Sequence, residues 1–255
     1  MKILRTPAEL KLELQNIRRL RPQVTVGFVP TMGALHDGHK TLLQKARSEN
    51  DICGLSIFVN PTQFNDPQDL SKYPKTWDSD LEMAEAIGVD FVFAPNVNEM
   101  YPDDYRYQLI EKMNSKMLCG KDRPGHFDGV LTVVMKLFNL VQPTKAYFGE
   151  KDYQQLQLIQ GMVQSFFMDI EIVPVATVRE ATGLAMSSRN MRLNDAEREI
   201  APLFYQTLTH AKTDTEAINV LEKNGFLVDY VQDIKGRRFG AAKLGTVRLI
   251  DNVQI

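Results

Sequence analysis

The sequence predicts an α/β fold, a parallel sheet with helices on both faces, followed by a small C-terminal α+β domain. Over the first two-thirds of the 255 residues, short runs rich in Val, Ile and Phe alternate with segments of helical apolar spacing. This alternation is typical of parallel strands joined by helical crossovers. Polar, turn-rich segments follow three of the apolar runs, which places them at the carboxyl edge of the sheet, where such folds bind ligands.

The elements follow the chain in a regular order. Strands are predicted at residues 24–29, 52–59, 91–94, 146–148 and 170–175. Helices are predicted at residues 7–20, 40–48, 76–87, 130–141 and 153–167. We expect residues 1–175 to form a Rossmann-like domain and residues 176–255 to form a small second domain, because the pattern changes at this point of the chain.

The second domain is predicted to combine helices with a few strands. Asn194 has the character of an N-cap for a helix that ends near residue 209. A second helix, residues 215–224, ends at Asn224-Gly225, a common helix C-terminal signal. Residues 227–231 and 247–250 are then predicted to be strands.

Composition and net charge argue against several classes of protein. A formal net charge of -2 gives no electrostatic reason to expect nucleic acid or an anionic membrane as a partner. The longest apolar stretch, residues 130–141, contains Lys136 and Asn139 and is too short to span a bilayer. The first seven residues lack the apolar core of a signal peptide, and the two cysteines do not resemble a disulfide framework. We therefore expect a cytoplasmic protein.

Residues 24–39, VTVGFVPTMGALHDGH, are the most informative segment. An apolar strand leads into a Pro/Gly turn and then into His36 and His39, with Gly38 between them, at the start of a helix. Helix N-termini at this edge of a sheet bind anions through unpaired backbone N–H groups and the helix dipole. The segment predicts a phosphate site built on histidines, and the alternative is a histidine pair that only caps the helix.

Better-known motifs do not fit this segment. A Walker A loop requires lysine at the position of His39. No G-x-G-x-x-G follows a strand-like run, which argues against a dinucleotide dehydrogenase. A zinc site lacks further ligands, because Cys53 and Cys119 are isolated in the sequence.

Residues 60–65, NPTQFN, form a polar loop after a strongly apolar strand. The amides of Asn60 and Gln63 are suited to bidentate hydrogen bonds with a hydroxy acid or with an adenine edge. The alternative is an ordinary Asn-Pro turn.

Residues 149–155, GEKDYQQ, again follow a strand and open a helix. Lys151 is suited to pairing with a phosphate, and Asp152 is suited to capping the helix or holding a magnesium-bound water. The alternative is a solvated, charged helix start.

Residues 186–190, MSSRN, follow a glycine-containing loop. Two hydroxyls and a guanidinium are good partners for phosphate oxygens. The alternative is a polar linker between domains.

Taken together and in this order, the four segments resemble the pantoate–β-alanine ligases, nucleotidylyltransferase relatives that carry HIGH-type and KMSKS-type motifs. Residues 30–39 correspond to the HIGH element, and residues 58–64 correspond to the pantoate loop of that family. Residues 149–155 and 186–190 correspond to its two later ATP-site elements. The resemblance covers almost the whole chain.

The resemblance implies a two-step reaction. The carboxylate of pantoate attacks the α-phosphorus of ATP, and the amine of β-alanine then attacks the resulting acyl adenylate, giving pantothenate and AMP. Mg²⁺ is expected to accompany ATP, and the family is usually dimeric, so a homodimer is expected. Because a mixed anhydride hydrolyses in water, a closing element is expected, and the C-terminal domain is the expected lid.

The resemblance also implies roles for individual residues. Those expected to stabilise the ATP phosphates are His36, His39, Lys151, Ser187, Ser188 and Arg189. Those expected to hold pantoate are Asn60, Gln63 and Gln155. Those expected to line the nucleotide pocket are Pro30, Thr31, Met32, Gly149, Asp152, Val178 and Met186. No metal ligand and no base for the β-alanine amine is assigned.

Two features depart from the family pattern. The region 231–243 is shorter than expected, which predicts a smaller C-terminal domain. Ser79 stands where an acidic residue often occurs, so the run from Trp77 to Asp80 is given no metal role. Two other functions stay open at this point: a transferase that stops at a nucleotidyl product, and a nucleotide-binding regulator without catalysis.

Overall fold

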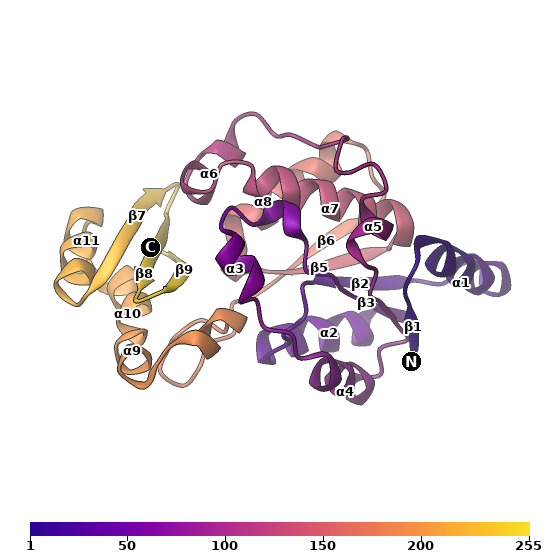
Figure 1. The fold of residues 1–255 in the computed structure, drawn as a ribbon, viewed down its shortest axis with the longest axis horizontal. Coiled ribbons are helices and arrows are strands. Elements are labelled where there is room, and N and C mark those ends of the chain that lie inside the picture. Colours follow the sequence, from indigo (N-terminus) through magenta and orange to yellow (C-terminus); the bar gives the residue numbers. More distant parts are fainter. The chain divides into compact units, whose positions relative to one another are not determined.

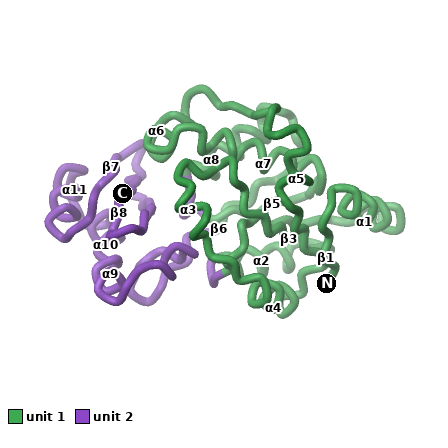
Figure 2. Tube along the Cα trace, in the orientation of Figure 1, with its two compact units in different colours: residues 1–35, 39–149, 154–175 green, residues 36–38, 150–153, 176–255 purple.

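The chain folds into two units (Figure 2), and the structure, a computed structural model, describes all of residues 1–255. Unit 1 comprises Met1–Leu35, His39–Gly149 and Gln154–Val175. Unit 2 comprises His36–Gly38, Glu150–Tyr153 and Ala176–Ile255. Two short segments of unit 2 therefore interrupt the stretch of sequence that forms unit 1. The division of binding roles between residues 1–175 and 176–255 stays a prediction.

Six parallel strands form the sheet of unit 1, in the order β1-β4-β3-β2-β5-β6 (Figure 1). Their bounds are Lys2–Leu4 for β1, Val26–Thr31 for β2, Ile52–Ile57 for β3, Phe91–Phe93 for β4, Lys145–Gly149 for β5 and Glu171–Val175 for β6. The predicted parallel α/β fold is confirmed, and all five predicted strands are present. The sequence does not predict β1, because three residues at a sheet edge carry too short a pattern.

Helices cover both faces of this sheet (Figure 1). One face carries α2 (Asp37–Glu49) and α4 (Trp77–Ile87), and the other carries α1 (Pro7–Leu20), α7 (His126–Val141) and α8 (Tyr153–Ser165). The shorter helices α3 (Pro67–Ser71), α5 (Val97–Met100) and α6 (Cys119–Asp122) lie in connections. Single 3₁₀ turns are η1 (Pro61–Gln63), η2 (Asn114–Lys116) and η3 (Glu150–Asp152). None of the helices combines the length and apolar character that a membrane crossing requires.

Local sequence signals fix several helix ends. α1 begins with a capping box, in which the Thr6 hydroxyl accepts from the Glu9 backbone N–H while the Glu9 carboxylate accepts from the Thr6 N–H. Pro7 follows at the first helical position, where its missing N–H costs nothing. α4 ends at Gly88, whose φ of 83° is the left-handed conformation typical of a helix C-terminus.

α7 begins four residues earlier than the sequence predicts. The glycines at 125 and 129 favour a loop, yet residues 126–129 are helical. A Cβ at Gly129 would lie 2.6 Å from the carbonyl oxygen of Thr62 in η1. The glycine is therefore needed for close approach of this helix to the loop that follows β3, rather than for flexibility.

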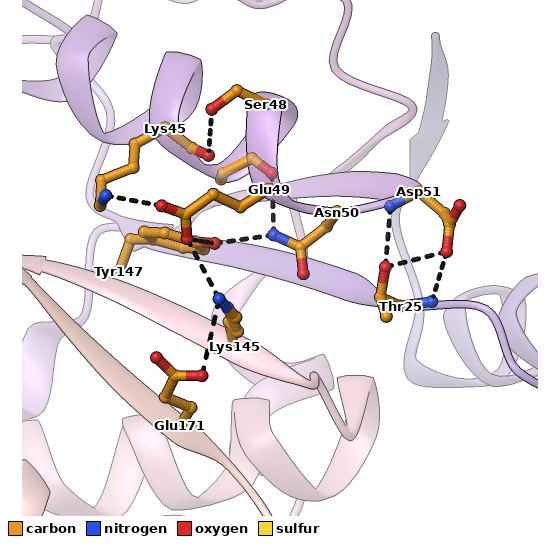
Figure 3. Close-up of polar contacts among 10 residues, drawn as sticks. Thr25, Lys45, Ser48, Glu49, Asn50, Asp51, Lys145, Tyr147 and Glu171 are labelled. Atoms are coloured by element: carbon orange, nitrogen blue, oxygen red, sulfur yellow. Dashed lines mark hydrogen bonds and ion pairs between the residues drawn. The ribbon is translucent and has the colours of Figure 1, made fainter.

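A polar cluster fastens the C-terminal end of α2 to the amino edge of the sheet (Figure 3). The Glu49 carboxylate accepts from Lys45 Nζ at 2.6 Å, from the Tyr147 hydroxyl at 2.9 Å and from Lys145 Nζ at 3.3 Å. Asn50 donates to the Tyr147 hydroxyl at 2.7 Å and to the Ala46 carbonyl. The Lys45 hydrogen bond, followed by the one from Tyr147, lowers the pKa of Glu49 to about 2.

Unit 2 contains a three-stranded antiparallel sheet and three helices. The strands, in the order β7-β8-β9, are Phe226–Ile234, Arg237–Leu244 and Val247–Gln254. The helices are α9 (Asp195–Ile200), α10 (Pro202–His210) and α11 (Asp214–Lys223), and η4 (Ser188–Arg192) precedes them. The apolar core between α10, α11 and the sheet includes Phe204, Leu208 and Leu221.

One prediction for this unit is wrong in detail, and one strand is missed. The single helix predicted from residue 194 to 209 is two helices, because Pro202 has no N–H to continue the hydrogen-bond ladder of α9. The sequence does not predict β8, whose Gly240-Ala241-Ala242 run has low β propensity. A Cβ at Gly240 would lie 2.8 Å from Leu208, so the small residue is set by the close packing of α10.

Candidate active site

The turn after β2 is built from an unusual backbone. Gly33 and Ala34 both have positive φ, 79° and 50°, and for alanine this conformation costs about 1–2 kcal/mol. The Thr31 hydroxyl donates to the Ser56 carbonyl of β3 at 2.7 Å and accepts from the Gly33 N–H at 3.1 Å. The end of β2 is thereby fixed to β3 at the predicted ligand edge.

Asp80 in α4 holds the rest of this turn. Its carboxylate accepts from the backbone N–H of Ala34 at 2.9 Å and from that of Leu35 at 2.8 Å, and Thr76 donates to it at 2.9 Å. Asp80 is 2% exposed. Its oxygens are thus occupied by hydrogen-bond donors of unit 1, and its role is to stabilise the strained turn.

In the sequence, Asp80 stands out only as part of the run from Trp77 to Asp80, which is given no metal role. The available signal is the spacing of Thr76 and Asp80, which puts a hydroxyl and a carboxylate one helical turn apart at the start of α4. The partners of Asp80 are more than forty residues away in sequence, so no local pattern reveals them.

Asn60 is the centre of the loop that follows β3. It is 1% exposed. Its Oδ1 accepts from the Tyr101 hydroxyl at 2.8 Å and from the Thr62 hydroxyl at 3.0 Å, and its Nδ2 donates to Gln63 Oε1 at 3.0 Å and to the Gly129 carbonyl at 3.2 Å. Both ends of the amide are therefore engaged within unit 1. The geometry gives Asn60 the task of orienting Gln63.

Gln63 lies beside Met32, with Gln63 Nε2 3.2 Å from Met32 Sδ. The structure thus brings a residue predicted to bind pantoate next to one predicted to line the nucleotide pocket. The Gln63 backbone carbonyl also lies 2.8 Å from His126 Nδ1 and accepts from Arg123 Nη2 at 3.1 Å. Tyr101 and Arg123, which the sequence does not assign to the site, support this loop together with His126. Burial raises the pKa of Tyr101 to about 12, so its phenol stays a donor.

Gly149 and Gln155 complete the predicted residues of this edge. Gly149 ends β5, which pairs with β2, and no atom lies within 4 Å of the position that a Cβ would occupy there. Gln155 lies in the first turn of α8 and is half-buried. His39, in the first turn of α2, and half-buried Pro30, in β2, also belong to unit 1.

In unit 2, His36 is held as a neutral imidazole. Burial, and secondly the positive charge of Lys151, lower its pKa to about 4. Its Nδ1 accepts from the Gly38 N–H at 3.2 Å, which places the ring proton on Nε2. A Cβ at Gly38 would lie 2.9 Å from the ring, so glycine is required by this close approach. The same Cβ position lies 3.7 Å from Met186, which brings Met186 to the histidine.

Lys151 and Asp152 are presented by the single turn η3. Lys151 Nζ lies 3.9 Å from Asp152 Oδ2, and the two side chains are 19% and 46% exposed. An ion pair this long and this exposed stabilises little. Its charges are therefore suited to meeting a ligand.

The loop before η4 forms a tight turn. The Met186 N–H donates to the Val178 carbonyl at 2.9 Å, and Gly183 adopts a φ of 93° at the tip. The Ser187 hydroxyl accepts from the Arg189 N–H at 3.3 Å, and Ser188 is buried. Asn190 donates to the Ala185 carbonyl at 3.0 Å and to Glu180 at 3.1 Å. Asn190 thus fixes the backbone of residues 186–190, which carry the predicted phosphate ligands.

Each unit therefore carries one part of the predicted site. Unit 1 gathers amides and a thioether at the carboxyl ends of β2 and β3. Unit 2 gathers a neutral imidazole, a lysine ammonium and the turn of residues 186–190. The first set suits a small hydroxylated acid and the second suits an anion.

A sequence model of the family described as pantoate-beta-alanine ligase matches residues 2–254. A pantothenate synthetase of Bdellovibrio bacteriovorus is 62% identical over 253 residues, 99% of each chain. One from Legionella pneumophila is 54% identical over 91% of this chain and 92% of its own. The chain thus spans almost the full length of these relatives, and the smaller second domain expected from residues 231–243 stays a prediction.

Two solved structures are similar over the full chain. The pantoate-beta-alanine ligase of Francisella tularensis, complexed with beta-gamma ATP and beta-alanine, has a TM-score of 0.94 and 41% identity, and the match covers 100% of this chain and 97% of that one. The pantothenate synthetase of Thermus thermophilus has a TM-score of 0.89 and 40% identity, with 100% and 99% covered.

Proposed function

Because this chain belongs to the pantoate–β-alanine ligase family, we propose that it joins pantoate to β-alanine through a pantoyl adenylate and releases pyrophosphate and AMP. The observation that carries this chemistry is His36, whose Nδ1 accepts from the Gly38 N–H so that Nε2 keeps the ring proton, near the positive charge of Lys151. An N–H donor and a cation supply what transfer to an α-phosphorus requires, since the pantoate carboxylate is itself the nucleophile.

In the first proposed step, a pantoate carboxylate oxygen bonds to the α-phosphorus while the bond from that phosphorus to the α,β-bridging oxygen breaks. Pyrophosphate leaves with the electron pair. His36 donates from Nε2 to a phosphate oxygen, and His39 donates to another. Lys151, Ser187, Ser188 and Arg189 share the negative charge that develops.

In the second proposed step, the neutral amine of β-alanine attacks the acyl carbon, AMP leaves, and the nitrogen loses a proton. No side chain is assigned as the base. The nucleotide would lie against Pro30, Thr31, Met32, Gly149, Asp152, Val178 and Met186.

Pantoate would be held by the loop that follows β3. Asn60 fixes the carbonyl end of the Gln63 amide, which leaves the Gln63 Nε2 group to address substrate. Its partner in this structure is the thioether of Met32, a weak acceptor that a carboxylate or hydroxyl oxygen can replace. Gln155 would contribute a second amide.

Mg²⁺ would enter with ATP. No group of three or more His, Cys, Asp or Glu side chains in residues 1–255 is arranged to hold a metal ion, and Asp80 is occupied by backbone donors. Magnesium often keeps its waters and binds chiefly through substrate phosphates. When bound, it would neutralise phosphate charge. The lid role of the C-terminal domain, the homodimer and the cytoplasmic location are proposals of the same kind.

An isotope experiment tests the adenylate. Pantoate labelled with ¹⁸O in its carboxylate is incubated with ATP, Mg²⁺ and β-alanine, and AMP is examined by mass spectrometry. The proposal expects one labelled oxygen in each AMP, because the carboxylate oxygen that bonds to phosphorus leaves with it. Unlabelled AMP, or ADP and phosphate as products, would overturn the adenylate.

A further inference from the structure

The segment Glu150–Tyr153 belongs to unit 2, although β5 before it and the rest of α8 after it belong to unit 1 (Figure 2). This segment carries Lys151. The contacts that hold it come from the C-terminal sheet of unit 2. They involve side chains that the reaction proposed above does not use.

Asn252 in β9 holds the two backbone carbonyls that flank the Lys151 Cα. Its Nδ2 donates to the carbonyl of Glu150 at 2.9 Å and to the carbonyl of Lys151 at 3.0 Å. Its Oδ1 accepts from Arg237 Nη1 at 2.5 Å. Asn252 is 4% exposed. The whole amide is thus used within the protein, and Arg237 fixes which end faces the lysine turn.

The far end of the segment is held by two neighbours of Asn252. Phe239 lies opposite Asn252 across the β8–β9 pair. The Phe239 ring lies 6.0 Å from the Tyr153 ring, and the Arg237 guanidinium lies over Tyr153 at 4.0 Å from its centroid. Arg237 therefore connects the two contacts, since it orients Asn252 and covers Tyr153.

The residue before Asn252 holds a second predicted ATP-site segment. Asp251 pairs with the Arg179 guanidinium through two contacts, 2.6 Å and 3.0 Å, and Arg179 directly follows Val178. The Asp251 carboxylate also accepts from the Asn252 backbone N–H at 2.8 Å. Two consecutive residues of β9 thus organise two loops that are far apart in sequence.

We propose that Asn252, oriented by Arg237, is the positioning residue that fixes the Lys151 turn for its work on the ATP phosphates. This inference rests on the proposed function. Lysine has a long, flexible stem, so fixing both carbonyls around it limits where its ammonium can lie. Misplacement of such a group lowers the rate of phosphoryl chemistry more than it weakens binding.

The test is a mutant cycle on the full-length enzyme, measured as steady-state pyrophosphate release at saturating ATP–Mg²⁺ and β-alanine over a range of pantoate concentrations. Asn252→Ala is expected to lower kcat by about tenfold or more, with the pantoate KM changed by less than about twofold. Asn252→Asp is expected to lower it further, because a carboxylate oxygen would then face two carbonyl oxygens. Asp229→Asn is the matched control: it weakens the 2.7 Å contact to Arg248 in the same sheet and should leave kcat within about twofold.

The decisive arm adds Asn252→Ala to Lys151→Ala. If Asn252 acts through the lysine, the double variant is no slower than Lys151→Ala alone. If Asn252 has only a structural role, its tenfold effect is retained in the double variant, and the inference is overturned. A folded Asn252→Ala enzyme with wild-type kcat also overturns it.

If Asn252→Ala has no cooperative thermal transition, Arg237→Met replaces it, with an expected loss of about threefold in kcat that must vanish in the Lys151→Ala background. If Lys151→Ala turns over normally, both the inference and the role of Lys151 fall, while pantothenate formation by the wild type would still support the proposed reaction.

Discussion

The two edges of the unit 1 sheet use polar side chains in different ways. At the amino edge, Glu49 accepts hydrogen bonds from Lys45, Lys145 and Tyr147 (Figure 3). The Glu49 side chain is 29% exposed, whereas Tyr147 is fully buried. At the carboxyl edge, Asp80 and Asn60 are almost fully buried and bond to backbone groups or orient one further side chain. The first arrangement joins a helix to strands, whereas the second shapes loops.

This difference indicates which edge of the sheet is important for function. Ion pairs between partly exposed side chains, such as that of Glu49 with Lys145, add modest stability. Buried side chains that hold loop backbone determine where the loop presents its own groups. Substitutions at the amino edge are therefore expected to change only the free energy of unfolding, and those at the carboxyl edge to change the reaction rate as well.

The largest expected effect is on the groups that touch the phosphates. His39→Ala and Lys151→Ala are each expected to lower kcat by about 100-fold, which is about 2.7 kcal/mol of transition-state stabilisation. Thermal unfolding should be nearly unchanged, since neither side chain is part of the apolar core. Steady-state kinetics and calorimetry on the same samples check this. Near-normal turnover in both variants would remove them from the mechanism.

Asp80→Asn tests the role of the buried side chains at the carboxyl edge. The substitution keeps the shape of the side chain. It places an amide NH₂ opposite one of the groups that donate hydrogen bonds to Asp80. We expect a loss of about 2 kcal/mol in unfolding free energy and a loss of about tenfold in kcat. Urea unfolding and kinetics measure the two. A stability loss with unchanged kcat would show that the turn needs no fixing for catalysis.

Tyr147→Phe is the counterpart at the amino edge. It removes the hydroxyl that joins Glu49 to Asn50, and a cost of about 1 kcal/mol in stability is expected. Activity should stay within about twofold, because this hydroxyl lies at the opposite edge from the loops that bind substrate. A tenfold loss of kcat in this variant would contradict the division between the edges.

A pH dependence of stability is also expected. The pKa of His36 is about 4 in the folded protein against 6.5 for a free imidazole, so between these values only the unfolded chain binds this proton. The stability from this residue is complete above pH 6.5 and is lost as pH falls toward 4. Urea unfolding at pH 7, 6 and 5 should show a fall that is smaller in His36→Gln. Parallel curves for the two proteins would contradict the neutral imidazole.

The sequence predicts most of unit 1 because its strands are buried on both faces and its helices have clear ends. It fails where tertiary contacts override local preference. β8 forms despite its small residues because Leu208 and Phe204 pack on Gly240, and α7 extends through Gly129 because η1 lies against it. The break at Pro202 was open to prediction, since proline has no N–H to donate to the preceding helical turn.

For the candidate site, the sequence supplies the groups with chemical character but not the ones that hold them. His36, Gln63 and Lys151 are visible because their residue types suit phosphate or hydroxy-acid binding. Asp80 and Asn252 are not visible, because their role depends on hydrogen bonds to backbone groups 45 to 102 positions away. A buried polar side chain at the end of an ordinary helix or strand carries no local signal of this kind.

The most direct test of the central claim is pyrophosphate release in a single turnover. Enzyme is mixed with ATP–Mg²⁺ and pantoate in the absence of β-alanine, and β-alanine is added afterwards. We expect one pyrophosphate for each active site in the first phase, and we expect AMP and pantothenate to be released only after β-alanine is added. Pyrophosphate release that waits for β-alanine would contradict a separate adenylate step.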